Sequence, residues 1–278
     1  KQYHFFNPRA GVSYTLAERN NFYLSFAVAQ KEPTRSDFTD RYKFAADDTY
    51  PSSEKLYDWE LGYQYTAPCL SLGVNLYYMK YKDQLVPTGM VNDDSNALNT
   101  NVPDSYRRGV ELSASWRATG WFTVGANATF SQNRIENYVD ALKDSPTYGK
   151  ELGDMTIAYS PDVIANAFLN FHHRGFEAVF HTQHVGKQYF TNNENDALSL
   201  DAYCVTNLNL AYTFRTRSAR SVRLGLLINN LFNAEYESNG YGYSYMDTWS
   251  GPAPVRIDEA YYFPQAPLNV LANVTVKF

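Results

Sequence analysis

The chain has 278 residues and a formal net charge of −5, which is enough for one large domain or two small ones and leaves no basic stripe for a nucleic acid. Its mean hydropathy of −0.46 and the lack of any apolar run of about 18 residues exclude a helix that crosses a membrane. Strands that cross a membrane are half polar, so this value does not exclude them. The 24 Tyr and 17 Phe suit a protein with many boundaries between water and an apolar medium.

Eleven strand-like segments can be marked along the chain, and the connections between them alternate between short and long. We expect strands at residues 7–16, 21–30, 55–66, 70–82, 105–117, 121–134, 161–172, 176–187, 200–214, 221–231 and 268–278. The long connections are residues 31–54, 83–104, 135–160, 188–199 and 232–267, and four of these five far exceed ordinary hairpin loops. Short turns at one end and long loops at the other are typical of outer-membrane barrels, whose long loops are extracellular.

Apolar and polar residues alternate within most of these segments, so that each strand has one face for an apolar medium and one for a polar medium. In the third segment Tyr57, Trp59 and Leu61 share one parity, and Asp58 and Glu60 share the other. Aromatic residues gather near both ends of the strands, as they do at the two surfaces of a membrane. A soluble β-sandwich would alternate equally well, but it would not need long loops at one end only. The pattern therefore favours a membrane barrel.

The odd number of strands has a further consequence, because bacterial single-chain barrels have an even number and both termini in the periplasm. The last segment, residues 268–278, ends at the side of the short turns, so the first segment must start at the side of the long loops. An open sheet would expose unpaired backbone groups to lipid at both edges. We therefore expect residues 1–278 to be the C-terminal part of a larger closed barrel.

Four motifs resemble elements of the TonB-dependent outer-membrane receptor family. They are NFYLSFAVAQKEPTRSDF (21–38), EKLYDWELGYQY (54–65), SYRRGVELSASWR (105–117) and LGLLINNLFNAEYES (224–238), in the family's order. The residues that carry the signatures, together with the terminal aromatic residue of the family's last strand, are Gly109, Val110, Glu111, Asn229, Asn230, Leu231, Phe232, Tyr236 and Phe278. We expect these residues to determine the fold rather than to touch a ligand, with Gly109 letting a strand bend or pass close to something inside the barrel.

The resemblance implies an all-β fold, an antiparallel transmembrane β-barrel of which this chain supplies about the last eleven of twenty-two strands, without the plug domain. It also implies TonB-dependent active import of a scarce, large nutrient, most simply a ferric siderophore or a similar iron chelate, across the outer membrane of a Gram-negative bacterium. The implied partners are outer-membrane lipid, the plug and barrel half missing from this chain, the TonB complex acting through the missing N-terminal region, and a small-molecule metal chelate. No cofactor is implied.

Other members of the family take up haem or cobalamin, and both remain alternatives for this chain. Haem receptors carry an Asn-Pro-Asn-Leu motif in the loop after the Pro-containing strand exit, and the corresponding stretch here reads DRYKFAADDTYPSSEK (40–55). Because that motif is missing, haem is less expected than an iron chelate. Cobalamin stays open, since its contacts could lie in the missing half.

The strongest candidates for ligand contacts are aromatic and basic residues in the expected long loops. They are Arg35, Arg41, Tyr42 and Lys43 in the first loop, Tyr148 and Lys150 in the third, and Tyr241, Tyr243, Tyr245 and Trp249 in the last. Tyr and Trp offer rigid contact area with a polar tip, which suits a bulky amphipathic ligand, and cations beside them favour an anionic chelate. The alternative is that these aromatic residues pack the loops against one another.

No catalytic constellation is evident, and we expect no enzyme. An outer-membrane enzyme barrel and a soluble β-rich binding module are the alternatives of other classes. His181 and His184 lie three residues apart on an expected strand, so they point to opposite faces and cannot chelate one metal. The acidic pairs at 47–48 and 93–94 could bind calcium but are more simply solvated. Cys69 and Cys204 are expected to be free thiols.

Overall fold

The computed structural model describes residues 2–39, 50–92 and 96–278 of the chain. Its strands are β1 (Arg9–Leu16), β2 (Asn20–Lys31), β3 (Glu54–Thr66), β4 (Leu70–Val91), β5 (Ala97–Arg117), β6 (Phe122–Ile135), β7 (Met155–Thr156), β8 (Val163–His173), β9 (Phe176–Val185), β10 (Gln188–Tyr189), β11 (Ser199–Leu200), β12 (Tyr203–Phe214), β13 (Ser221–Asn229), β14 (Glu237–Asp247), β15 (Val255–Pro264) and β16 (Asn269–Lys277). Short helices lie at α1 (Arg35–Thr39) and at the 3-10 helix η1 (Asp196–Leu198). None of the helices in the described ranges is both long and apolar enough to cross a membrane.

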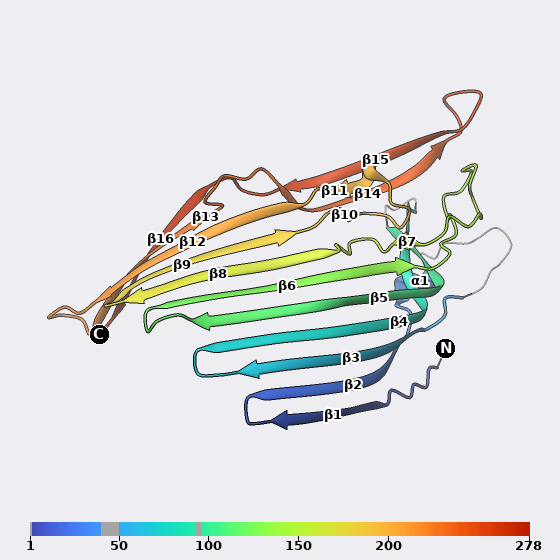
Figure 1. Cartoon of the computed structure of the whole chain (residues 1–278). Helices are drawn as coiled ribbons and strands as arrows, with labels where there is room; N and C mark the ends of the chain where they lie inside the picture. The colour runs from blue at the N-terminus through green and yellow to red at the C-terminus, as the bar shows by residue number, and fades with distance from the viewer. Residues whose placement is uncertain (1, 40–49, 93–95) are drawn as a thin grey trace.

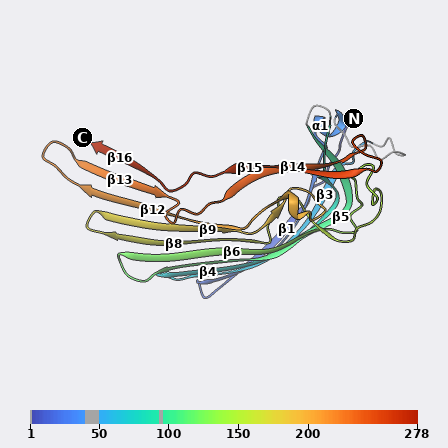
Figure 2. The ribbon, with the colours of Figure 1, turned by 90° about the horizontal axis from the view of Figure 1, so that it is seen from above.

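Eleven strands form one continuous antiparallel sheet in the order β1-β2-β3-β4-β5-β6-β8-β9-β12-β13-β16, and β7 adds a short pairing to β6 (Figure 1). The eleven wall strands expected from the sequence are therefore confirmed. Figure 2 shows that the sheet is curved rather than flat. Its path starts at β1 and stops at β16, so the sheet is an open arc of a barrel wall, half the strand number of a 22-stranded transporter barrel.

Short turns join the strands at one end of the sheet, which we call the turn end, and the longer connections lie at the other, the loop end (Figure 1). Two long connections differ from the sequence expectation because they contain regular strands. β4 and β5 continue through most of residues 83–104 as a hairpin, in which Gln84 pairs with Val102 and Val86 with Thr100. Residues 232–267 contain the separate β14–β15 hairpin. In both segments strand pairing satisfies backbone groups that a long irregular loop would leave to water.

Residues that lie opposite one another across the sheet define an apolar face and a polar face. One row across β2 to β6 consists of Leu24, Leu61, Leu76, Val110 and Phe130. The next row consists of Ser25, Glu60, Tyr77, Gly109 and Ser131. Leu24 and Leu61 are each 51% exposed, and a continuous row of exposed large apolar side chains is what a lipid-facing wall requires.

Aromatic contacts mark both borders of the apolar face. Towards the loop end the Trp59 ring stacks on Tyr57, with centroids 6.1 Å apart, and makes a tilted contact with Tyr78, with centroids 5.8 Å apart. Towards the turn end the rings of Phe122 and Phe171 lie 4.4 Å apart. Two such belts are the usual arrangement at the two surfaces of a membrane, so the expected belts are present.

The clusters of fully buried apolar residues lie in the connections at the loop end rather than in the barrel wall. One cluster consists of Val86, Val102, Ile135, Tyr138 and Ile157, and a second of Phe190, Leu198 and Leu200. The buried amide of Asn192 joins two connections, because its Oδ1 accepts from the Ala158 N–H at 2.7 Å and its Nδ2 donates to the Pro87 carbonyl at 2.6 Å. The loop end therefore packs in the manner of a small soluble domain.

Candidate ligand-binding site

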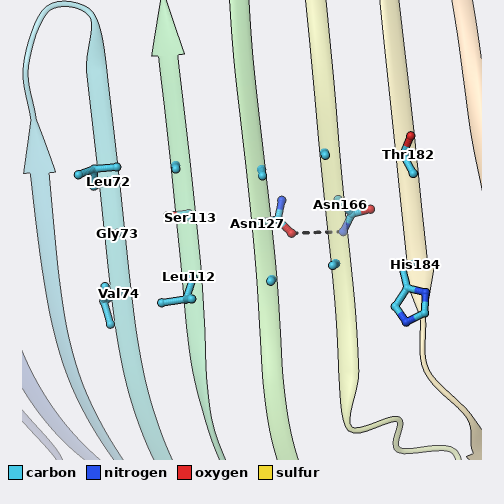
Figure 3. A pocket seen from close by; sticks show the side chains of 14 residues that line it. Leu72, Gly73, Val74, Leu112, Ser113, Asn127, Asn166, Thr182 and His184 are labelled. Atoms are coloured by element: carbon cyan, nitrogen blue, oxygen red, sulfur yellow. Dashed lines mark hydrogen bonds between the residues drawn. The ribbon is translucent and has the colours of Figure 1, made fainter. Parts of the chain in front are cut away.

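A shallow groove of about 490 Å³ crosses the apolar outer face of the wall (Figure 3). Its floor is made by small side chains, which are Ala114, Ala126, Ala128, Ala165 and Ala167. Figure 3 shows Leu72, Val74 and Leu112 on one side of the groove and Thr182 and His184 on the other. Because this face is apolar and exposed to lipid, we assign the groove to the membrane contact and not to a transported ligand.

A second cavity, of about 480 Å³, lies at the loop end between the extended β4–β5 hairpin and the β14–β15 hairpin. Its lining residues are Pro87, Gly89, Met90, Val91, Ala97, Tyr159, Phe190, Tyr241, Gly242, Tyr243 and Tyr261. The wall is therefore largely aromatic and apolar, with phenol groups as its polar points. This volume falls within the range of small-molecule sites, and we call it the tyrosine cavity.

The sequence Gly240-Tyr241-Gly242-Tyr243 determines how the β14–β15 hairpin docks. Successive side chains of a strand point to opposite faces, so the two glycines share one face and the two tyrosines the other. A Cβ at Gly240 would lie 2.7 Å from the Phe190 ring, and one at Gly242 would lie 2.9 Å from a Leu198 methyl group. The glycines thus allow the hairpin backbone to lie directly on the second buried cluster, while the tyrosine face remains available for contacts.

A carboxylate lies in the middle of the tyrosine face. Glu259 Oε2 accepts hydrogen bonds from the hydroxyls of Tyr243 at 2.6 Å and Tyr261 at 2.9 Å, and its Oε1 accepts from Tyr245 at 3.2 Å. The rings of Tyr241 and Tyr261 stack with centroids 4.9 Å apart. Strand register produces this cluster, because Tyr243 pairs with Glu259 and Tyr241 with Tyr261.

The hydrogen bonds fix the charge of this cluster. The bonds from Tyr243 and Tyr261 hold the pKa of the Glu259 carboxyl below its ordinary value. The same bonding to Glu259 raises the pKa of Tyr243 and of Tyr245 above the ordinary phenol value. At neutral pH the cluster is therefore one carboxylate surrounded by protonated phenols. Each phenol uses its single O–H to bond Glu259, so its oxygen is left to accept hydrogen bonds from a ligand.

The structure brings some of the sequence-predicted ligand residues together and leaves others apart. Tyr241 and Tyr243 line the tyrosine cavity and Tyr245 joins the Glu259 cluster. Trp249 follows β14 and is 94% exposed. The remaining described candidates are Arg35 on α1 and Tyr148 and Lys150 in the 135–160 connection, and none of these lines the cavity. The candidates Arg41, Tyr42 and Lys43 lie outside the described residues.

Sequence reasoning missed several residues of the site, including Tyr159, Phe190, Glu259 and Tyr261. The alternation Val255-Arg256-Ile257-Asp258, followed shortly by the aromatic run 261–263, is a strand signal. It could have identified β15 as the partner of the Tyr241–Trp249 run. Phe190 and Tyr159 come from other connections, and only tertiary packing brings them here.

The family motif after β13 makes the strand exit. Asn230 is 3% exposed and has a φ of 51°. Its Oδ1 accepts from the Ala234 N–H at 2.8 Å, its Nδ2 donates to the Ala234 carbonyl at 2.8 Å, and its own N–H donates to Asn207 Oδ1 at 2.9 Å. Tyr236 stacks on Tyr203 with centroids 4.7 Å apart. Asn tolerates this left-handed conformation better than most residues, so the motif has a structural role here.

On the polar inner face, Gly109 allows a close approach of a side chain. A Cβ at this position would lie 2.7 Å from the Tyr77 hydroxyl oxygen and 2.4 Å from the Phe130 carbonyl oxygen. We expected Gly109 to let a strand bend or pass close to something inside the barrel, and the neighbour in this chain is the Tyr77 ring on β4. Near this ring the inner face carries Glu60 and Glu111, and Asn75 Nδ2 donates to Glu111 Oε2 at 3.2 Å.

No group of three His, Cys, Asp or Glu within the described ranges could hold a metal ion. His184 pairs with Ala165 and His181 with Phe168, so the two histidines lie on opposite faces as expected. Cys69 and Cys204 are free thiols, also as expected. The acidic pairs at 47–48 and 93–94 both lie outside the described residues.

Comparison with known proteins connects this geometry to a family. Residues 1–231 match the sequence profile described as TonB dependent receptor-like, beta-barrel. The chain belongs to this family. It is accordingly part of an outer-membrane β-barrel of a TonB-dependent receptor from a Gram-negative bacterium. A search of curated proteins finds no match.

Several solved structures share the fold. The ferric yersiniabactin uptake receptor FyuA from Yersinia pestis superposes with a TM-score of 0.66 at 19% identity, over 97% of this chain and 37% of that one. The ferric-catecholate import receptor Fiu from E. coli K12 superposes with a TM-score of 0.65 at 18% identity, over 96% of this chain and 34% of that one. The copper transporter OprC superposes with a TM-score of 0.68 at 18% identity, over 96% of this chain and 38% of that one. This chain therefore spans little more than a third of the length of these TonB-dependent receptors.

Proposed function

We propose that this protein takes part in TonB-dependent import of an iron chelate of the siderophore type, as one section of a receptor that also includes a plug domain and further barrel strands. The observation that supports this ligand class is the tyrosine cavity at the loop end. Its wall includes Tyr159, Tyr241, Tyr243, Tyr261 and Phe190. In outer-membrane barrels this end faces the outside of the cell, where such a ligand arrives.

The chemistry of the cavity supports a bulky chelate with flat faces and oxygen acceptors. Aromatic rings provide rigid contact area for the faces, and the hydroxyls of Tyr159 and Tyr241, which do not bond Glu259, can donate to the ligand. No Lys or Arg lines the cavity in the described part of the chain. Recognition here would therefore depend on aromatic contact more than on charge. The similar receptors named for ferric yersiniabactin and ferric catecholates favour the same ligand class.

We also propose that the inner wall contacts a basic segment of the plug. Asp58, Glu60 and Glu111 lie on the polar face of β3 and β5, and among the described residues Asp58 Oδ1 is buried without a hydrogen-bond partner. Buried carboxylates are costly unless they are paired, so this face needs a partner inside the complete barrel. A cationic side chain of the plug would supply it.

Gene deletion followed by growth on single iron or cobalamin sources tests the import function. We expect growth to fail on one ferric siderophore and to be unchanged on free iron salts and on cobalamin. A defect confined to cobalamin, or no defect on any iron chelate in the panel, contradicts the proposal.

Substitutions in the full-length receptor test the cavity itself. Tyr243→Ala should weaken chelate binding by roughly 10- to 100-fold, because it removes an aromatic anchor, whereas Tyr243→Phe retains the ring and loses only the hydroxyl. Affinity can be followed by quenching of intrinsic fluorescence. Trp249→Ala, at the exposed tip of the same hairpin, should have a smaller effect since Trp249 does not line the cavity. Equal affinity of all three variants and the unmodified receptor places the site elsewhere.

A further inference from the structure

Positive charge is concentrated at the turn end of the sheet. The short turns, with three strand residues on either side of each, and the last three residues of β16 contain eight Lys or Arg and two Asp or Glu. The basic residues are Arg19, Arg117, Arg174, Arg215, Arg217, Arg220, Arg223 and Lys277. The whole chain has the opposite balance, with 24 basic and 29 acidic residues. The charge at this end is therefore a local feature and not a consequence of overall composition.

Most of these cations belong to one arc of the rim, formed by the β8–β9 turn, the β12–β13 turn and the end of β16. The two turns are neighbours, because the Thr213 N–H donates to the Gly175 carbonyl at 2.8 Å. The end of β16 joins them through the pairing of Ser221 with Lys277. Figure 1 shows the β12–β13 turn beside the C-terminus at this end of the sheet. We call this arc the basic rim.

Among the described residues, one cation of the basic rim has an ion-pair partner and the others have none. Arg223 Nη2 lies 2.5 Å from Glu177 Oε2. Arg174, Arg215, Arg217 and Arg220 are exposed and have no carboxylate at ion-pair distance among the described residues. Both strands that flank the β12–β13 hairpin, β9 and β16, belong to the sheet, so its neighbours along the wall are present. Four guanidinium groups are left to bind an anion from outside the chain.

The position of the basic rim identifies the anion. Phe176 and Tyr212 pair with each other on the apolar face just inside the turns and are 44% and 50% exposed. Aromatic residues of this kind lie at the headgroup level of a membrane, so the arginines immediately beyond them reach the phosphates. The short turns of outer-membrane barrels face the periplasm, and the adjacent leaflet is the periplasmic one.

We propose that Arg174, Arg215, Arg217 and Arg220 form a binding surface for anionic phospholipid headgroups of the periplasmic leaflet. Guanidinium groups bind phosphate oxygens in a bidentate manner, and a cluster on one arc selects a lipid with net negative charge over a zwitterionic one. The surface would fix the last hairpins of the barrel to a layer of anionic lipid. This role is separate from ligand import, because the tyrosine cavity lies at the opposite end of the strands.

Lipid titration of the purified full-length receptor, followed by native mass spectrometry, tests the surface. Phosphatidylglycerol should bind in preference to phosphatidylethanolamine. The triple variant Arg215→Gln/Arg217→Gln/Arg220→Gln should reduce that preference by on the order of 100-fold, because each of the three lost arginines contributes the attraction of one basic residue to an anionic surface. Two single variants serve as matched controls. Arg217→Gln should reduce the preference for phosphatidylglycerol roughly fivefold. Arg19→Gln should leave this preference unchanged, because Arg19 lies on the distant β1–β2 turn beside Glu18.

Raising the salt concentration provides a second test that needs no variant. The preference of the unmodified receptor for phosphatidylglycerol should fall with ionic strength, since exposed charges are screened. Equal binding of the two lipids, a salt-independent preference, or a triple variant that retains it would each overturn the proposal. Chelate affinity of the triple variant should equal that of the unmodified receptor, so failure here is distinguishable from failure of the import function.

Discussion

The turn end and the loop end of the sheet are stabilised in different ways. At the turn end, hairpins close within a few residues, and large side chains such as Val274 and Phe278 are 66% and 92% exposed. At the loop end, Ile135 and Leu198 are fully buried, and the separate β14–β15 hairpin packs on Leu198 without joining the sheet. The wall thus relies on strand pairing and a lipid solvent, and the site relies on side-chain packing in water. Perturbations of the two regions should therefore be separable.

Phe190→Ala should produce the largest effect, because Phe190 is 2% exposed and supports both glycines of β14. We expect a loss of about 3–5 kcal/mol of local stability, the range for a large core truncation. Hydrogen exchange of the full-length receptor should show the β14–β15 hairpin opening while β4 to β9 remain protected in the wall. Phe190→Leu should cost less. Loss of protection throughout the wall would show that the two regions are not independent.

Leu76→Arg tests the wall in the same comparison. Leu76 is 48% exposed in the apolar row, and a basic residue near the bilayer midplane costs roughly 2–4 kcal/mol. Urea unfolding in liposomes should report this loss, with chelate affinity unchanged in the folded fraction. The matched variant is Asn75→Arg, one residue earlier on the polar face, which should cost less. An equal cost at both positions would contradict the assignment of the faces.

Lowering the pH should give the smallest effect, confined to the hairpin. The folded-state pKa of Glu259 lies below its unfolded value of about 4.3, so the carboxylate contributes stability that is fully present above that value. This contribution is lost as the pH falls through the lowered folded-state pKa. Hydrogen exchange at pH 3 should therefore show more hairpin opening than at pH 7. Glu259→Gln should reduce this pH dependence without abolishing it, because hydrogen bonds also hold the pKa values of Asp247 and Asp258 in the same hairpin below their ordinary values. An unchanged pH dependence would assign the effect to those two groups.

The wall was predictable from the sequence, because the two-residue alternation is a local signal that strand pairing does not alter. Rows such as Leu24, Leu61 and Leu76 follow directly from the parity of each segment. The extended β4–β5 hairpin was not predicted, because Pro87 and Gly89 are turn-forming residues and indicate a loop. Pro87 is accommodated where the register between the two strands shifts, so the hairpin continues past it.

The site was predictable only in part, because half of it depends on register and packing. The Tyr241–Trp249 run is visible as an aromatic segment, and two of its tyrosines line the cavity. Glu259 and Tyr261 reach the cluster through the pairing of β14 with β15. Phe190 lies in a connection some fifty residues before Gly240 in the chain, and no local sequence pattern relates these two residues.

The β14–β15 excursion leaves and re-enters the wall at a single pair of opposed residues. Asn229 pairs with Asn269, and Asn229 Nδ2 donates to Asn269 Oδ1 at 2.9 Å. Just beyond this pair, Asn230 and Tyr236 still contact β12, through the hydrogen bond from the Asn230 N–H to Asn207 Oδ1 and the stacking of Tyr236 on Tyr203. The β14–β15 hairpin is therefore an insertion between two wall strands that pair directly with each other, so a change in its length would leave the register of β13 against β16 as it is.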